Sequence, residues 1–323
     1  MHAWGHSLVK LAALGVPLAI AAMLGWWGQT PRQDAAHEPW SDYLHPVAVS
    51  DVSDLQRLFD ELDYTWPPPP GRSVPRIAVE PLPEDYDRIG DAQTRKSVFF
   101  RVLLPLVLAE NARILQQRER LQHILRQHTP PDEASPGGEY LRELMREYRL
   151  KGDPADPGLR AELLRRVDMI PAALVLAQAA NESGWGTSRF AREGNNLFGV
   201  WTYRVGTGLV PMARPEGETH SLRVFGTLRD SVRYYLHNLN VGHAYGELRL
   251  LRAQLRTQGG SLDSLVLAGG LTRYSSRGLD YIGEIQSIIR ANHLRAVRAA
   301  DLRNEDLRTA SRNRTIADAA IDG

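Results

Sequence analysis

Apolar residues recur at helical spacing through most of the chain after residue 90. Residues 94–127 have apolar positions three and four apart, followed by a charged second half, which predicts one long helix or two. Pro105 is expected to kink or divide this segment because proline removes a backbone hydrogen bond. The apolar centre is too short to cross a bilayer before Glu110 interrupts it, so we expect it to pack in a core. Similar patterns predict helices over residues 54–62, 139–148, 159–167, 171–183, 228–239, 245–258, 261–268 and 278–291.

The pattern changes between residues 200 and 225, where Val, Thr, Tyr, Gly and Pro dominate and the stretch SLRVF alternates polar with apolar residues. This texture predicts a β-hairpin or a small sheet. The expected fold class is therefore α+β and mainly α. It comprises a helical domain with a small β lobe, preceded by a helical N-terminal region.

Proline-rich stretches suggest where the chain divides. Residues 67–71 read PPPPG, which is typical of an extended polyproline II spacer, and residues 128–137 read HTPPDEASPG. We expect a linker and N-terminal helical region over 31–135, the main domain over 136–296 and a polar C-terminal tail over 297–323.

Residues 11–27 form an uncharged apolar run that follows Lys10 and precedes a polar stretch. At the start of a chain, such a run indicates an export segment, here residues 1–30, rather than a core helix. It ends in Trp26 and Trp27, which suit a membrane interface, but residues 19–21 also offer a cleavage site. The segment is thus either a removed signal peptide or a retained membrane anchor.

Composition narrows the classes of function. Of 323 residues, 43% are hydrophobic and 24% are charged, as in an ordinary globular protein. The 39 Lys and Arg residues balance 38 Asp and Glu residues, for a net charge of +1, so nucleic acid is not an expected partner. The absence of cysteine excludes disulfides and Cys-ligated metals. His220, His237 and His243 lack metal-ligand spacing, so we predict neither a metal nor another cofactor.

The stretch QAANESGWGTSRF, residues 178–190, places a glutamate at the end of an apolar helix, directly before a Gly-Trp-Gly turn. The negative end of the helix dipole and the apolar surroundings both disfavour an ionised carboxylate at Glu182. A carboxyl group that keeps its proton to higher pH is suited to protonate a glycosidic oxygen. A lone glutamate at a helix end is ordinarily only solvated, but the surrounding motif favours Glu182 as a general acid.

The stretch AQAANESGWGTSRFA, followed by NNLFG at residues 195–199, resembles the endo-β-N-acetylglucosaminidase family of bacterial peptidoglycan hydrolases, glycoside hydrolase family 73. The upstream stretch FFRVLLPLVLAENARIL resembles the Bax-type subgroup of that family. This resemblance implies a lysozyme-like domain that cleaves the β-1,4 bond after N-acetylglucosamine in peptidoglycan glycan strands, with Glu182 as the acid. It also implies a location in the periplasm or cell envelope, with inner-membrane attachment if the N-terminal segment is retained.

The resemblance assigns further residues to substrate binding. Asn196 and Phe198 belong to the NNLFG motif, which is expected to shape the floor of a cleft, although Phe198 suits core packing equally well. Trp185 and Trp201 are candidates for stacking on sugar rings, and both also suit structural packing.

Two tyrosines match the family's Y-x-x-D/S-x-x-Y pattern. Tyr274 is expected near the reaction centre, where its phenol would orient the acetamido group or stabilise charge. Tyr281 is a substrate-binding candidate that is also suited to pack against the closing helix. Residues 275–277 read SSR where the family more often has ATD, which argues against an acidic role there.

The second catalytic group has two candidates. In an inverting mechanism, a carboxylate of the β lobe activates water, and Glu218 is the first choice with Glu216 as the alternative. If the substrate's own N-acetyl group assists instead, Glu182 is the single required carboxylate and Tyr274 becomes more important.

Two other functions remain open. A lytic transglycosylase or muramidase also places a glutamate at a helix end before Ser-Gly, and cuts after N-acetylmuramic acid. A non-catalytic protein would bind glycan and recruit an envelope partner through its N-terminal helices.

Overall fold

The computed structural model describes residues 44–127, 134–204, 206–212, 214 and 217–303. The predicted export segment lies outside these ranges. Within them, no helix combines the length and hydropathy needed to cross a bilayer.

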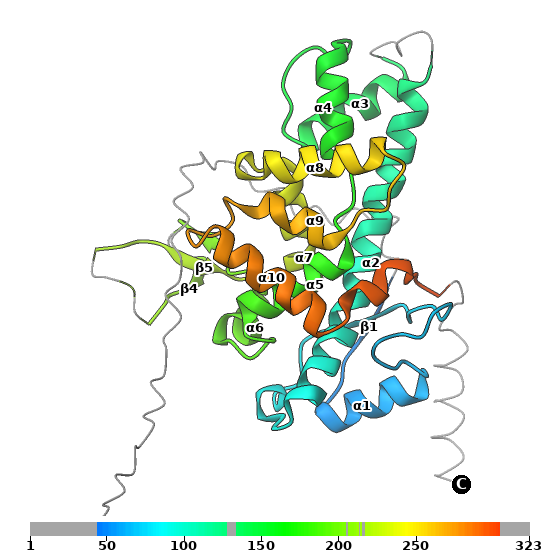
Figure 1. Ribbon diagram of the computed structural model, residues 1–323. Helices are drawn as coiled ribbons and strands as arrows, with labels where there is room; N and C mark the ends of the chain where they lie inside the picture. Colours follow the sequence, from blue (N-terminus) through cyan, green and yellow to red (C-terminus); the bar gives the residue numbers. More distant parts are fainter. Residues whose placement is uncertain (1–43, 128–133, 205, 213, 215–216, 304–323) are drawn as a thin grey trace, which may run out of the picture.

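Helices dominate the described chain, with small sheets at two places (Figure 1), which confirms the predicted α+β, mainly α class. The helices are α1 (Val52–Glu61), α2 (Ala92–Leu125), α3 (Pro136–Glu147), α4 (Pro157–Arg166), α5 (Ala172–Ser183), α6 (Arg189–Gly194), α7 (Leu228–Val241), α8 (Gly246–Thr257), α9 (Ser264–Ala268) and α10 (Leu279–Ala291). Shorter 3-10 turns are η2 (Tyr86–Arg88), η3 (His243–Tyr245), η4 (Gly269–Leu271) and η5 (Leu294–Ala299). The helices predicted from periodicity are confirmed, with ends shifted by a few residues.

The 34-residue helix α2 runs through the molecule as one continuous element (Figure 1). It begins at the N-cap Asp91, whose carboxylate accepts a hydrogen bond from the amide of Thr94 at 2.6 Å. Pro105 lies inside the helix and is buried, so the prediction that it divides the segment is wrong, whereas a kink at Pro105 stays a prediction. The apolar residues on either side of it are buried, and this packing offsets the missing backbone hydrogen bond.

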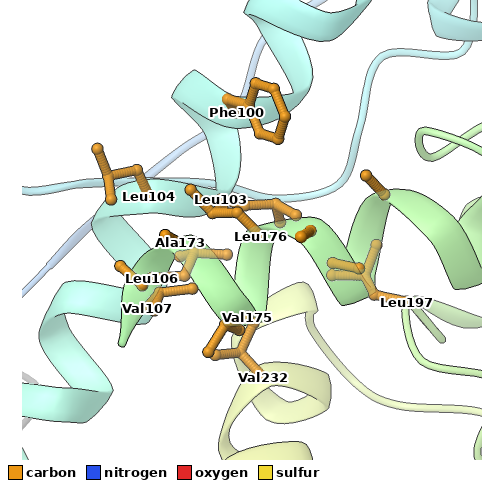
Figure 2. Packing of buried hydrophobic residues seen from close by; sticks show 14 of the residues in the cluster. Phe100, Leu103, Leu104, Leu106, Val107, Ala173, Val175, Leu176, Leu197 and Val232 are labelled. Carbon is orange, nitrogen blue, oxygen red and sulfur yellow. The ribbon is translucent and has the colours of Figure 1, made fainter. Parts of the chain in front are cut away.

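The main core lies between α2 and α5. Figure 2 shows side chains of α2, including Phe100 and Leu103, packed with Ala173 and Leu176 of α5, and Val232 of α7 nearby. Every residue from 172 to 180 is buried, as expected for a helix that is apolar all round. The core therefore fixes α5 firmly and brings its last turn to a defined place.

A second, smaller core forms where the C-terminal half of α2 meets α3 and α4, at the upper end of the molecule in Figure 1. Its buried residues are Leu121, Leu141, Leu144, Met145, Tyr148, Leu163, Val167 and Val241.

The region before α2 is packed onto the main core. The strands β1 (His45–Val47) and β2 (Ile77–Val79) pair in parallel, and Trp66 stacks on Phe100 with ring centroids 4.7 Å apart. Near the other end of the described chain, Leu302 is buried and forms a parallel bridge with Val74. Segments predicted as linker and tail thus contribute to the same core as α5, and the proposed domain boundaries stay predictions.

The β lobe is a three-stranded antiparallel sheet in the order β3-β5-β4. Its strands are β3 (Trp201–Thr202), β4 (Gly208–Leu209) and β5 (Ser221–Arg223). This confirms the small sheet predicted between residues 200 and 225.

Candidate active site

Glu182 lies in the last turn of α5, where the helix leaves the core. The helix ends at Gly184, which adopts a left-handed conformation with φ 57°. Glycine adopts this conformation with little strain, whereas other residues do not. The hydroxyl of Ser183 donates to the carbonyl of Ala179 at 2.6 Å and accepts from the amide of Gly186 at 2.8 Å. These bonds hold the turn that follows the glutamate.

The two carboxyl oxygens of Glu182 have different surroundings. Oε1 accepts hydrogen bonds from the hydroxyl of Tyr281 at 2.8 Å and from the side-chain amide of Asn181 at 3.5 Å. Oε2 lies beside Gly199, where an added Cβ would stand 3.9 Å away. Burial raises the pKa of Glu182, and the hydrogen bonds from Tyr281 and Asn181 only partly oppose that shift. The half-buried side chain is therefore suited to hold a proton and then to donate it.

Aromatic side chains connect α10 to the NNLFG motif. Tyr281, in the first turn of α10, is buried and stacks on Tyr274 with ring centroids 5.2 Å apart and planes at 13°. The hydroxyl of Tyr274 donates to the carbonyl of Phe198 at 3.3 Å, and the Phe198 ring stacks on Tyr235 at 3.8 Å. Thus Tyr281 makes the direct contact with Glu182, while Tyr274 lies behind it.

The Gly-Trp-Gly turn packs against the start of α2. The Trp185 ring meets Phe99 and Phe100 edge-on, at centroid distances of 6.1 and 5.5 Å, and Nζ of Lys96 lies 4.9 Å from its centroid. The hydroxyl of Tyr86 donates to the carbonyl of Trp185 at 2.9 Å. Residues outside the main predicted domain therefore help to position the turn that follows Glu182.

Comparison with known proteins assigns the chain to a family. Residues 160–294 match the glucosaminidase family model, described as mannosyl-glycoprotein endo-beta-N-acetylglucosaminidase. The chain is 33% identical over 200 residues to "Protein bax" of Escherichia coli (strain K12), a match that spans 61% of this chain and 69% of that protein. The chain belongs to the Bax-type glucosaminidase family. No solved structure matches it.

The Bax-type glucosaminidase domain contains Glu182, Gly199 and Tyr281, which all lie within the matched residues. Membership in a glycosidase family indicates a glycoside hydrolase.

Asn196 is buried and its side-chain amide is fully engaged with main chain. Nδ2 donates to the carbonyls of Val200 and Arg223, both at 2.9 Å, and Oδ1 accepts from the amide of Val200 at 2.9 Å. Phe198 is buried as well. The Asn196 side chain therefore ties the NNLFG motif of this Bax-type domain to the β lobe, and a direct contact of Asn196 or Phe198 with substrate stays a prediction.

The β lobe carries the other predicted site residues. The Trp201 ring meets His220 edge-on at 4.7 Å, and Nδ1 of His220 lies 3.3 Å from a carboxylate oxygen of Glu218. The Glu218 side chain is 58% exposed. Among the described residues, no hydrogen bond joins Glu218 to Glu182, and Glu216 lies outside the described residues.

Sequence reasoning assigned no role to Gln178 or Tyr235, yet hydrogen bonds connect both residues to Glu182 through Tyr281. Gln178 is buried and its Nε2 donates to the hydroxyl of Tyr281 at 2.9 Å, while the hydroxyl of Tyr235 donates to Oε1 of Gln178. A usable signal existed for Gln178, because it is the one polar residue between residues 172 and 180 and lies four residues before Glu182, on the same face of the helix. Tyr235 lies on α7, and nothing in the local pattern marked it.

In the part of the chain that the structure describes, no group of at least three His, Cys, Asp or Glu side chains could hold a metal ion.

Proposed function

We propose that this protein is a peptidoglycan hydrolase that cleaves the β-1,4 glycosidic bond after N-acetylglucosamine, with Glu182 as the general acid. The observation that carries this proposal is the setting of Glu182: a half-buried carboxyl group whose pKa is raised by burial, at the end of a rigid helix in a glucosaminidase domain. A protonated carboxyl group there can donate to the leaving oxygen as the glycosidic bond breaks.

The stereochemistry of the product identifies the second catalytic group. If a carboxylate such as Glu218 activates water, the anomeric configuration inverts. If the N-acetyl group of the substrate assists, the configuration is retained, and the proposed role of Tyr274, which stacks on Tyr281, is to support that group. The Glu218 side chain is exposed and contacts His220. The substrate-assisted route is therefore the first to test.

Peptidoglycan as substrate implies a place in the cell envelope. We propose that residues 1–30 direct export, as a signal peptide or as an inner-membrane anchor, and that residues 136–296 carry the glucosaminidase domain. Trp201, on the β lobe, and Trp185, on the turn after the acid, remain candidates for sugar stacking.

The test is digestion of purified peptidoglycan followed by mass spectrometry of the new glycan ends. Reducing N-acetylglucosamine ends support the proposal. Anhydro-N-acetylmuramic ends would show a lytic transglycosylase, reducing N-acetylmuramic acid ends a muramidase, and binding without cleavage a carbohydrate-binding protein.

The variant Glu182→Gln keeps the shape of the side chain and removes the acid, so turnover should fall by roughly 10²- to 10⁴-fold. Glu119→Gln is a matched control, because Glu119 is an exposed glutamate on α2. Equal activity of wild type and Glu182→Gln would remove Glu182 from the mechanism.

A further inference from the structure

A chain of hydrogen bonds runs through the main core to the carboxyl group of Glu182. The Tyr235 hydroxyl donates to Oε1 of Gln178, Nε2 of Gln178 donates to the Tyr281 hydroxyl, and that hydroxyl donates to Oε1 of Glu182. Tyr235, Gln178 and Tyr281 are all buried. The chain thus links α7, α5 and α10 inside the protein, out of contact with bulk water.

The amide of Gln178 gives this chain a direction. An amide nitrogen can only donate hydrogen bonds, whereas a tyrosine hydroxyl has one proton to donate. Because the Tyr281 oxygen already accepts from Gln178, its own proton is directed to Glu182. A hydroxyl that accepts one hydrogen bond also becomes a stronger donor for the next.

The donor-to-acceptor direction of these hydrogen bonds also decides which oxygen of Glu182 carries the acid proton. Oε1 accepts from both Tyr281 and Asn181, and a proton on that oxygen would point at these two donors. Oε2 lies beside Gly199, which has no side chain of its own.

We infer that Gln178 and Tyr235 are positioning residues that make Tyr281 a permanent donor to Oε1, so that the acid proton of Glu182 resides on Oε2, beside Gly199. This inference rests on the proposed role of Glu182 as the acid. Its consequence is directional: the leaving oxygen of the substrate approaches Glu182 from the side of Gly199, and the proton is not diverted into the core.

The direction of the hydrogen bond between Tyr281 and Glu182 is tested by the sign of the shift in the pKa of Glu182 when Tyr281 is replaced. A donor to a carboxylate stabilises the charged form, so Tyr281→Phe should raise the pKa of Glu182. The measurement is carbon-13 NMR of the full chain labelled at glutamate carboxyl carbons, with the Glu182 signal assigned by its loss in Glu182→Gln. A fall of the Glu182 pKa would mean that Tyr281 accepts a hydrogen bond from the protonated carboxyl group of Glu182, and no change would mean that the hydroxyl is not bonded to Glu182. Either result overturns the inference.

The positioning residues are tested by Gln178→Met and Tyr235→Phe, which weaken Tyr281 as a donor without removing it. Both should raise the pKa of Glu182 by less than Tyr281→Phe does, and lower kcat on soluble glycan strands by about tenfold with little change in KM. Tyr148→Phe is the matched control. It removes another buried bond from a tyrosine to a glutamine, Tyr148 to Gln117 at 2.9 Å, in the second core.

A purely structural role would give a different result. Tyr235→Phe and Tyr148→Phe would then both lower stability and leave the Glu182 titration at its wild-type position, which overturns the role of Tyr235. The titration needs no turnover, so a wild-type protein that fails to cleave peptidoglycan would refute the proposed function while the NMR result still decides the hydrogen-bond direction.

Discussion

Gly199 lies directly beside Oε2 of Glu182, and a Cβ at residue 199 would stand 3.9 Å from that oxygen. The glycine also has φ +64°, in the left-handed region that side chains rarely adopt. The last residue of the NNLFG motif therefore meets two demands at once. It lets the backbone turn, and it adds no side chain of its own beside Oε2 of Glu182.

Gly199→Ala should separate these two demands. The left-handed backbone should cost about 1–2 kcal/mol of stability, and the added methyl group beside Oε2 should lower kcat/KM by roughly tenfold or more. Thermal unfolding and steady-state kinetics measure the two effects.

Gly259→Ala is the matched control for this variant. Gly259 has nearly the same conformation, φ +65°, with no atom within 4 Å of an added Cβ. It should lose similar stability and keep full activity. Equal activity of both variants would show that substrate does not approach Oε2.

The stability of Glu182→Gln relative to wild type should depend on pH. Burial raises the pKa of Glu182 in the folded chain, so ionisation is less favourable there than in the unfolded chain. Below the ordinary glutamate pKa both states are protonated, and the two proteins should be similarly stable. As the pH rises through the raised pKa, wild type should lose free energy of unfolding relative to Glu182→Gln. Denaturant titrations across this range measure the difference, and a difference independent of pH would contradict the prediction.

Glu110 should show the opposite pH dependence. It is wholly buried on α2 and forms ion pairs with Arg113, Arg229 and Arg233, with N–O distances of 3.3, 2.7 and 3.0 Å. Burial acts to raise the pKa of Glu110, but Arg233 and Arg113 outweigh it and hold that pKa below its ordinary range. The stabilisation is therefore present at neutral pH and is lost as the pH falls through the lowered pKa.

Removing this carboxylate by Glu110→Gln should destabilise the protein by about 3–5 kcal/mol at neutral pH, because the arginines lose the carboxylate that balances their charge. Glu119→Gln, at an exposed position of the same helix, should change stability by less than about 0.5 kcal/mol. Urea unfolding of both variants measures this, and similar small losses would show that the network contributes little.

The region before the main predicted domain should be required for folding. Trp185 contacts Phe99 and Phe100 of α2, and the main core contains residues from both sides of residue 135. A fragment of residues 136–303 should therefore lack a cooperative thermal transition by circular dichroism, whereas a fragment of residues 44–303 should retain one. Equal transitions in both fragments would establish residues 136–303 as an independent domain.

The local sequence pattern was sufficient to predict the helices, the β lobe and the setting of Glu182 at the end of an apolar helix. Periodicity located the helices and the β lobe, because alternation of burial along one segment depends on that segment's own geometry. The apolar run before Glu182 also predicted a carboxyl group that resists ionisation, and burial indeed raises its pKa.

Long-range packing decided the rest. Tyr281, rather than Tyr274, contacts Glu182, and Gln178 and Tyr235 stand behind it, because α10 and α7 meet α5 only in the folded chain. Continuity of α2 through Pro105 likewise depends on the core around it. Contacts between residues distant along the chain depend on how elements pack, and no pattern within a single segment records that packing.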